Sequence, residues 1–124
     1  MTIWDLKTTP AGVAWDAVRI PASPGVRLWM RLTATPDTRV RLGPVVISDQ
    51  SQATYWLIPT GSRGADWPEP CRLLAAGAWL VLPGADNPAC AARWLHLPDD
   101  PLQLTGTVWL ADALNHHPTL EVQP

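Results

Sequence analysis

The sequence is short of several residue types that define common kinds of site. It contains no phenylalanine, one tyrosine, two cysteines and a single lysine, Lys7. Cys71 and Cys90 form no CxxC pair and have no histidine at ligand spacing, so we expect two buried thiols, no disulfide and no metal site. A formal net charge of −2 also lacks the basic excess that is typical of non-specific duplex binding.

Long hydrophobic runs are missing as well. The first ten residues, MTIWDLKTTP, hold no apolar stretch of the length that a secretory signal needs. No run approaches the roughly 18 consecutive apolar residues of a membrane span. The sequence therefore predicts a cytoplasmic protein with no membrane partner.

The residues that are present have the balance of a folded domain. Hydrophobic residues make up 47% of the 124 residues and charged residues 16%, which predicts one domain over residues 1–124, frayed at about 1–10 and 116–124. The 14 prolines fall between the apolar runs and therefore separate short elements. Each of the eight tryptophans brings a large apolar area and an N–H that needs a partner, so we expect some rings at the edge of a core or groove.

The periodicity of the apolar residues predicts an α+β fold. We expect a single-layer, mostly antiparallel or mixed sheet with about two helices on one face, in the order β-α-β-β-β-β-β-α. The strands are expected at residues 13–20, 40–48, 53–59, 71–75, 78–83 and 92–98. The helices are expected at residues 23–32 and about 105–115.

Local signals refine this arrangement. Ser23 is the candidate N-cap of the first helix, with Pro24 at its first position, and Thr105 or Thr107 is the candidate cap of the closing helix. The polar DQSQ segment predicts a hairpin between the second and third strands, and we expect a second hairpin between 78–83 and 92–98. Three residues are expected on the buried face of the closing helix: Val108, Ala111 and Leu114.

Several segments, taken in order, resemble a known family. These are RLGPVVIS, YWLIPTG, GAWLVLPG, ARWLHLP and the closing WLADAL. Their order and spacing are similar to those of prim-pol domains, the N-terminal catalytic domains of bifunctional DNA primase/polymerases in the archaeo-eukaryotic primase superfamily. The resemblance covers roughly residues 13–114. It implies a degenerate, shortened relative of that domain.

The resemblance also implies which catalytic residues have been lost. Asp16 matches the first of two family acids on a strand, but Val18 holds the second position. Tyr55 or Trp56 stands where the family has a nucleotide-handling histidine, and Cys71, before Arg72, replaces the third acid. Hard divalent cations need carboxylate oxygens, so a relic Asp16 alone predicts no bound metal, no cofactor and no polymerase activity.

Candidate binding residues have an alternative structural interpretation in each case. Arg72 and Arg93 could grip a phosphate or carboxylate together, or be solvated strand-edge residues. Trp56, Trp79 and Trp94 could form a stacking platform for bases, or belong to the core. Four arginines could form a basic patch or a solvated face: Arg27, Arg31, Arg39 and Arg41.

The sequence therefore favours a non-catalytic binding or regulatory domain that engages a protein partner, possibly itself, through an aromatic-rich surface. The first alternative is nucleic-acid or nucleotide binding through the inherited groove. The second is a metal-dependent nucleotidyltransferase with displaced acids, for which Asp49, Asp66 or Glu69 would replace the missing carboxylates.

Overall fold

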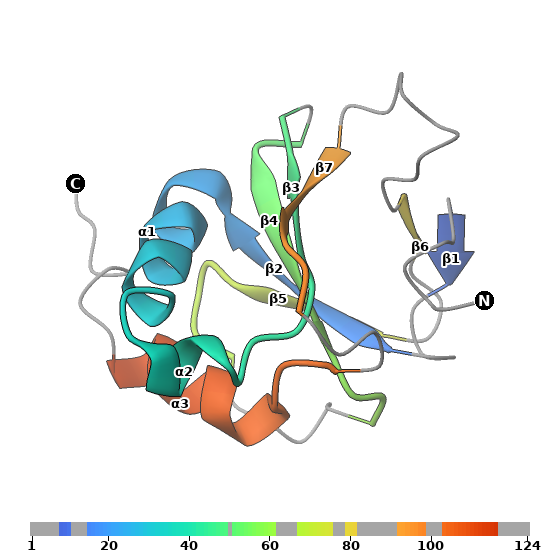
Figure 1. Ribbon diagram of the computed structural model, residues 1–124. Coiled ribbons are helices and arrows are strands. Elements are labelled where there is room, and N and C mark those ends of the chain that lie inside the picture. The colour runs from blue at the N-terminus through green and yellow to red at the C-terminus, as the bar shows by residue number, and fades with distance from the viewer. Residues whose placement is uncertain are drawn as a thin grey trace.

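A five-stranded antiparallel sheet forms the centre of the protein, and three helices lie on one face of it (Figure 1). This computed structural model describes residues 8–10, 15–49, 51–61, 67–75, 79–81, 92–98 and 103–116. The α+β class and the helical layer on one face were both predicted. The elements are β1 (Thr8–Pro10), β2 (Asp16–Pro21), α1 (Ala22–Leu32), α2 (Pro36–Arg39), β3 (Val45–Ser48), β4 (Ala53–Ile58), β5 (Arg72–Leu74), β6 (Trp79–Val81), β7 (Ala92–His96) and α3 (Thr107–His116).

The central strand, β4, explains why one run of the sequence is almost entirely apolar. The strand order is β5-β2-β4-β3-β7, and every residue of β4 is buried. A strand covered on both faces has no polar side to alternate with, which is why ATYWLI reads as a nearly continuous apolar run. The predicted hairpin between β3 and β4 is confirmed, with Val46 opposite Tyr55. Its turn places Gln52 at a φ of 56°, in the left-handed region.

The second expected hairpin is not formed. β6 is hydrogen-bonded to β1 in a separate two-stranded sheet, whereas β7 pairs with the outer edge of β3. Hairpin loops usually have about two to five residues, and the segment 82–91 between these two strands is longer. The connection therefore does not force its two flanking strands to pair.

The helical face of the sheet carries the larger of two hydrophobic clusters. Leu28 and Leu32 of α1 are buried, while Arg27 and Arg31 are exposed, which confirms the predicted amphipathic helix. The helix begins earlier than predicted, with Pro21 as its N-cap. Ser23 does not cap it, because its Oγ accepts a hydrogen bond from Arg27 Nη1 at 2.7 Å. The buried members are Val18, Ile20, Leu28, Leu32, Leu42, Val45, Trp56, Ile58, Leu110 and Leu114.

The opposite face is also covered. Figure 1 shows β1 and β6 on this side of the sheet, away from the three helices. A second cluster lies here, and Trp15, Val46 and Leu57 in it are fully buried. Apolar residues therefore line both faces of the sheet, and the strands alternate between two cores rather than between a core and solvent.

Two of the three residues predicted on the buried face of the closing helix are buried, and the third, Val108, is not. Leu110, Ala111 and Leu114 are buried, but Val108 is 79% exposed. Thr105 is buried before the helix begins, and its Oγ1 accepts the backbone N–H of Gly43 at 2.8 Å rather than one of the helix N–H groups. No helix within the described residues is both long and apolar enough to cross a membrane.

Parts of the expected ends lie outside the described residues, namely 1–7 and 117–124. The same holds for Cys90, so its distance from Cys71 is not defined by the structure. Residues 36–39 form the single-turn helix α2, for which no helix was predicted.

Candidate binding surface

The three tryptophans expected to form a stacking platform do not share a surface. Trp56 is fully buried in the cluster under the helices, where its Nε1–H donates to Thr54 Oγ1 at 3.0 Å. Trp94 is partly buried and packs against the cluster on the opposite face. Trp79 lies in the separate sheet with β1, and its side chain is outside the described part of the structure. Of these three rings, Trp56 belongs to the core.

The two arginines expected to grip one anion are far apart. Arg72 lies on β5 and Arg93 on β7, at opposite edges of the five-stranded sheet. Four spacings between neighbouring strands, at about 4.8 Å each, separate these edges by about 19 Å. Arg93 Nη1 also donates to Asp49 Oδ2 at 2.8 Å, in an ion pair whose two side chains are both 64% exposed. One ligand group cannot contact both guanidinium groups.

Asp16, which the resemblance implied to be a relic of a metal-binding pair, is buried at the beginning of β2. Asp16 is 1% exposed and pairs with Ile58, at the end of β4. Asp49 follows β3 at the hairpin turn, beside the opposite end of β2, so about 17 Å of strand separates it from Asp16. Of the other expected substitutes, Glu69 is exposed and Asp66 lies outside the described residues. Within the described chain, no group of three or more His, Cys, Asp or Glu side chains could hold a metal ion.

Cys71, which the resemblance aligned with the third family acid, does not have the lowered pKa of a reactive thiol. Cys71 precedes β5, is partly buried against the helical-face cluster and is a free cysteine. Burial raises the pKa of the Cys71 thiol from 9.0 to about 11. A thiol with that pKa is neutral at physiological pH, so it is a poor nucleophile and a poor metal ligand.

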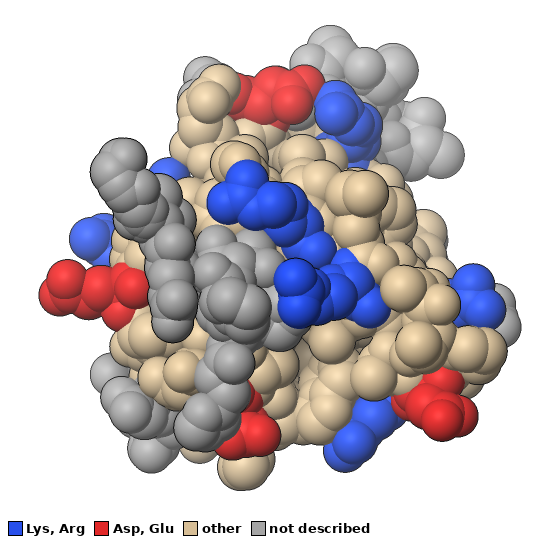
Figure 2. All heavy atoms as spheres, turned by 90° about the vertical axis from the view of Figure 1, so that its left-hand side faces the viewer, with Lys and Arg blue, Asp and Glu red and all other residues tan. Residues whose placement is uncertain are grey.

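A basic surface lies instead on the helical side of the molecule. The segment 27–41 contains four of the nine basic residues of the chain and one acid, Asp37. Figure 2 shows this side, with a contiguous group of basic side chains near its centre and the visible acidic side chains toward its rim. The four arginines of the segment 27–41 are all exposed: Arg27, Arg31, Arg39 and Arg41. This stretch is locally positive although the whole chain is negative.

Exposed aliphatic residues accompany these arginines. Met30 lies on α1, Val40 follows α2, Leu97 follows β7 and Val108 lies on α3. All four lie in α1 or α3, or directly follow α2 or β7. We call these four residues and the four arginines the helical surface. Arg41 is held there by Trp109 of α3, whose ring centroid lies 4.9 Å from the guanidinium carbon.

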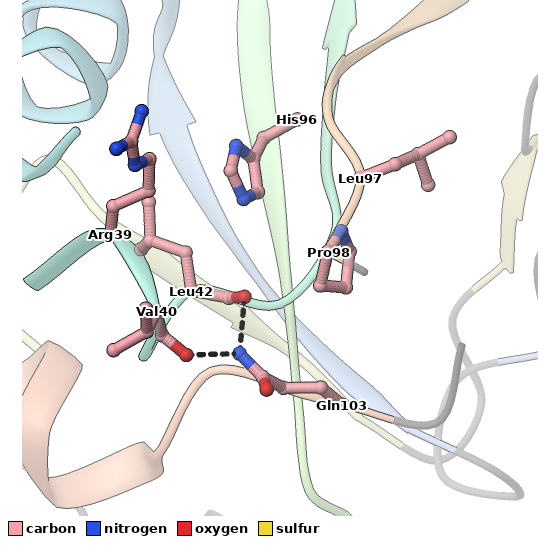
Figure 3. Close-up of a pocket in the computed structure, with 7 residues that line it drawn as sticks. All are labelled: Arg39, Val40, Leu42, His96, Leu97, Pro98 and Gln103. Atoms are coloured by element: carbon pink, nitrogen blue, oxygen red, sulfur yellow. Dashed lines mark hydrogen bonds between the residues drawn. The ribbon is translucent and has the colours of Figure 1, made fainter. Parts of the chain in front are cut away.

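An open cavity of about 490 Å³ interrupts the helical surface. Figure 3 shows it between the end of α2, the end of β7 and the segment that leads to α3. The ring of His96 points into this cavity, and the side chain of Arg39 lies beside the cavity. The described lining residues are Arg39, Val40, Leu42, His96, Leu97, Pro98 and Gln103.

Sequence reasoning noted the arginines but missed the cavity. His96 and Gln103 carry no motif, and they meet Arg39 only because β7 joins the edge of β3 and the following chain returns to α3. Exposure of Val40 and Val108 could not be detected in the apolar pattern, because both are hydrophobic residues within predicted elements, the strand 40–48 and the helix 105–115. Comparison with family models, with curated proteins and with solved structures found no match to this chain.

Proposed function

We propose that the chain is a non-catalytic binding or regulatory domain that engages an acidic protein partner through the helical surface. The observation that carries this proposal is the mixture of exposed arginine and exposed aliphatic side chains on one side of the fold. Arginine and methionine are enriched at protein interfaces, where the guanidinium group binds carboxylates in a bidentate manner. Aliphatic neighbours exclude water around such pairs.

A protein partner fits this surface better than a nucleic acid. Single-strand binders combine basic grooves with exposed aromatic rings on which bases stack. Among the residues that the structure describes, the exposed large apolar side chains are Met30, Val40, Leu97 and Val108, and Trp56 is in the core. The proposed interface is therefore arginine-rich and aliphatic, in place of the aromatic-rich surface expected from the composition.

The proposal also includes the ancestry of the protein and its location in the cell. The resemblance to prim-pol domains supports a degenerate relative in which Asp16 is a structural residue, and a cytoplasmic location fits such a relative. Nucleotidyl transfer is the weaker alternative, since it requires a second carboxylate near Asp16, and Asp49 stands at the other end of β2.

The proposal predicts the composition of peptides that the protein selects. On immobilised protein, a display library of random twelve-residue peptides should yield sequences enriched in Asp, Glu and aliphatic residues. A synthetic, fluorescently labelled peptide with the selected sequence should bind in an anisotropy assay. The double variant Arg27→Glu, Arg31→Glu should weaken this binding by about tenfold or more, because attraction at two exposed sites becomes repulsion.

Arg72→Glu is the matched control, because Arg72 is also exposed but lies at an edge of the sheet rather than on α1. Its affinity should stay within about twofold of the wild type. Selected peptides without acidic residues, or equal effects of the two variants, would refute the proposal. A twelve-nucleotide single-stranded DNA is measured in parallel. Tighter binding of the DNA that is lost on reversal of Arg27 and Arg31 would support the nucleic-acid alternative instead.

A further inference from the structure

We propose that the cavity beside α2 is a binding site for an aliphatic carboxylate, with Arg39 as the cation that receives the carboxylate group. This goes beyond the proposed function, because it assigns a small-ligand chemistry to a cavity that the partner surface surrounds. The volume of about 490 Å³ lies within the range of about 300 to 1,000 Å³ that is usual for small-molecule sites.

Hydrogen bonds hold one wall of the cavity in place. Gln103 Nε2 donates to the carbonyl oxygens of Val40 and Leu42, at 2.7 Å in each case (Figure 3). These bonds join the segment before α3 to the segment after α2. Because both amide hydrogens of Gln103 are used on backbone carbonyls, the orientation of its side chain is determined. These two hydrogen bonds therefore fix the wall of the cavity that Gln103 forms.

The imidazole of His96 forms another wall of the cavity. Trp29 Nε1–H of α1 donates to His96 Nδ1 at 3.5 Å, which joins α1 to the end of β7. The ring points into the cavity, near Arg39 (Figure 3).

Arg39 supplies the charge. It is exposed at the end of α2, and no ion-pair partner of its guanidinium group occurs among the described residues. A single guanidinium group matches one negative charge, and its planar fork fits a carboxylate in a bidentate geometry. This charge count favours a carboxylate over a doubly charged phosphate.

The rest of the lining selects an apolar body for the ligand. Val40, Leu97 and Pro98 supply aliphatic surface next to Arg39. An aliphatic chain attached to the carboxylate can cover this surface, including Leu97, which is 47% exposed. The same chemistry occurs in a free short-chain acid and at the C-terminal residue of a peptide.

The test is an NMR titration of the full chain with sodium hexanoate and, separately, with neutral hexanamide. Hexanoate should produce saturable shifts centred on the resonances of His96 and Leu97, with a dissociation constant on the order of 1 mM. Hexanamide should bind at least about tenfold more weakly, because it has the same shape without the charge. Arg39→Gln should weaken hexanoate binding by a similar factor, and Arg72→Gln, at an edge of the sheet, should leave it unchanged.

A leucine-terminated pentapeptide, with a free or an amidated C-terminus, distinguishes the two sources of the carboxylate. Tighter binding of the free peptide than of hexanoate would identify a peptide C-terminus as the ligand. Equal shifts with hexanoate and hexanamide, shifts that avoid His96 and Leu97, or an unaltered affinity in Arg39→Gln would overturn the proposal. The double variant at Arg27 and Arg31 should still bind the carboxylate, so failure of the partner proposal and failure of this one are separable.

Discussion

At the scale of single residues, one buried hydroxyl connects three elements. Thr54 Oγ1 donates to the carbonyl of Ile20 on β2 and accepts the indole N–H of Trp56, each at 3.0 Å. On its other side is Gly25 of α1, where a Cβ would collide with the same hydroxyl. Glycine in a helix interior costs about 1 kcal/mol relative to alanine. Here that cost allows α1 to approach the sheet closely over a fully satisfied Thr54.

Cys71 leads to a prediction at this scale. The folded protein keeps the thiol protonated up to a pKa of about 11, whereas in the unfolded chain it titrates near 9.0. The folded state therefore binds this proton more tightly, and the free energy of unfolding should fall as the pH rises from about 9 to about 11. We expect a loss of about 1 kcal/mol, because partial exposure of the group screens the effect.

The measurement compares urea unfolding of the wild type and of Cys71→Ala across this pH range. The difference between the two proteins isolates the contribution of the thiol. Identical pH profiles would contradict the prediction. In a Cys90→Ser background, thiolate absorbance should rise with a midpoint near 11 rather than near 9.

At the scale of elements, side chains outside the helices and strands position α3. The backbone N–H of Thr105 donates to the carbonyl of Leu57 at 3.1 Å, and its hydroxyl accepts the N–H of Gly43 at 2.8 Å. A Cβ on Gly43 would come within 2.7 Å of backbone atoms of Leu104 and Thr105, so the two segments are in direct backbone contact. The start of α3 is therefore fixed by the segment before β3 and by the end of β4.

Thr105→Val is the predicted test of this junction. Valine has nearly the same shape but leaves the N–H of Gly43 buried without an acceptor. We expect the free energy of unfolding to decrease by about 1–3 kcal/mol, as measured by urea denaturation. Thr60→Val serves as the control, because Thr60 is exposed, and its effect should be within about 0.5 kcal/mol. A Thr105→Val protein as stable as the wild type would show that the hydroxyl does not hold the junction.

At the scale of the whole molecule, β4 contributes alternate side chains to two hydrophobic clusters. Trp56 and Ile58 belong to the cluster beneath the helices, and Tyr55 and Leu57 belong to the cluster on the opposite face. A central strand shared in this way couples the two layers. Loss of packing in one cluster removes the support for a strand on which the other depends.

We therefore expect a single cooperative unfolding transition in which both clusters are lost together. Leu28→Ala on the helical face and Leu57→Ala on the opposite face should each reduce stability by about 2–5 kcal/mol. In each variant, tryptophan fluorescence and far-ultraviolet circular dichroism should give coincident urea transitions. Two separated transitions in either variant would show that the clusters unfold independently.

Much of the fold follows from local sequence features. The amphipathic spacing of α1, the apolar run of β4 and the polar segment before β4 predict a helix, a buried strand and a hairpin, and all three are present. These features depend on residues within a few positions of one another, so periodicity and turn chemistry report them directly. Errors at this level are small, as at the start of α1, where Pro21 rather than Ser23 is the cap.

The sequence by itself thus determined the α+β class and nearly every element, whereas strand partners and surface composition depended on tertiary structure. Which edge β7 joins, which strand pairs with β6 and which face of α3 is buried depend on contacts between distant segments. Because of those contacts, Trp56 lies in the core, and Arg72 and Arg93 lie at opposite edges of the sheet. The same contacts place His96 and Gln103 beside Arg39. Side-chain periodicity records that a residue is buried, but it carries no information on which distant residue buries it.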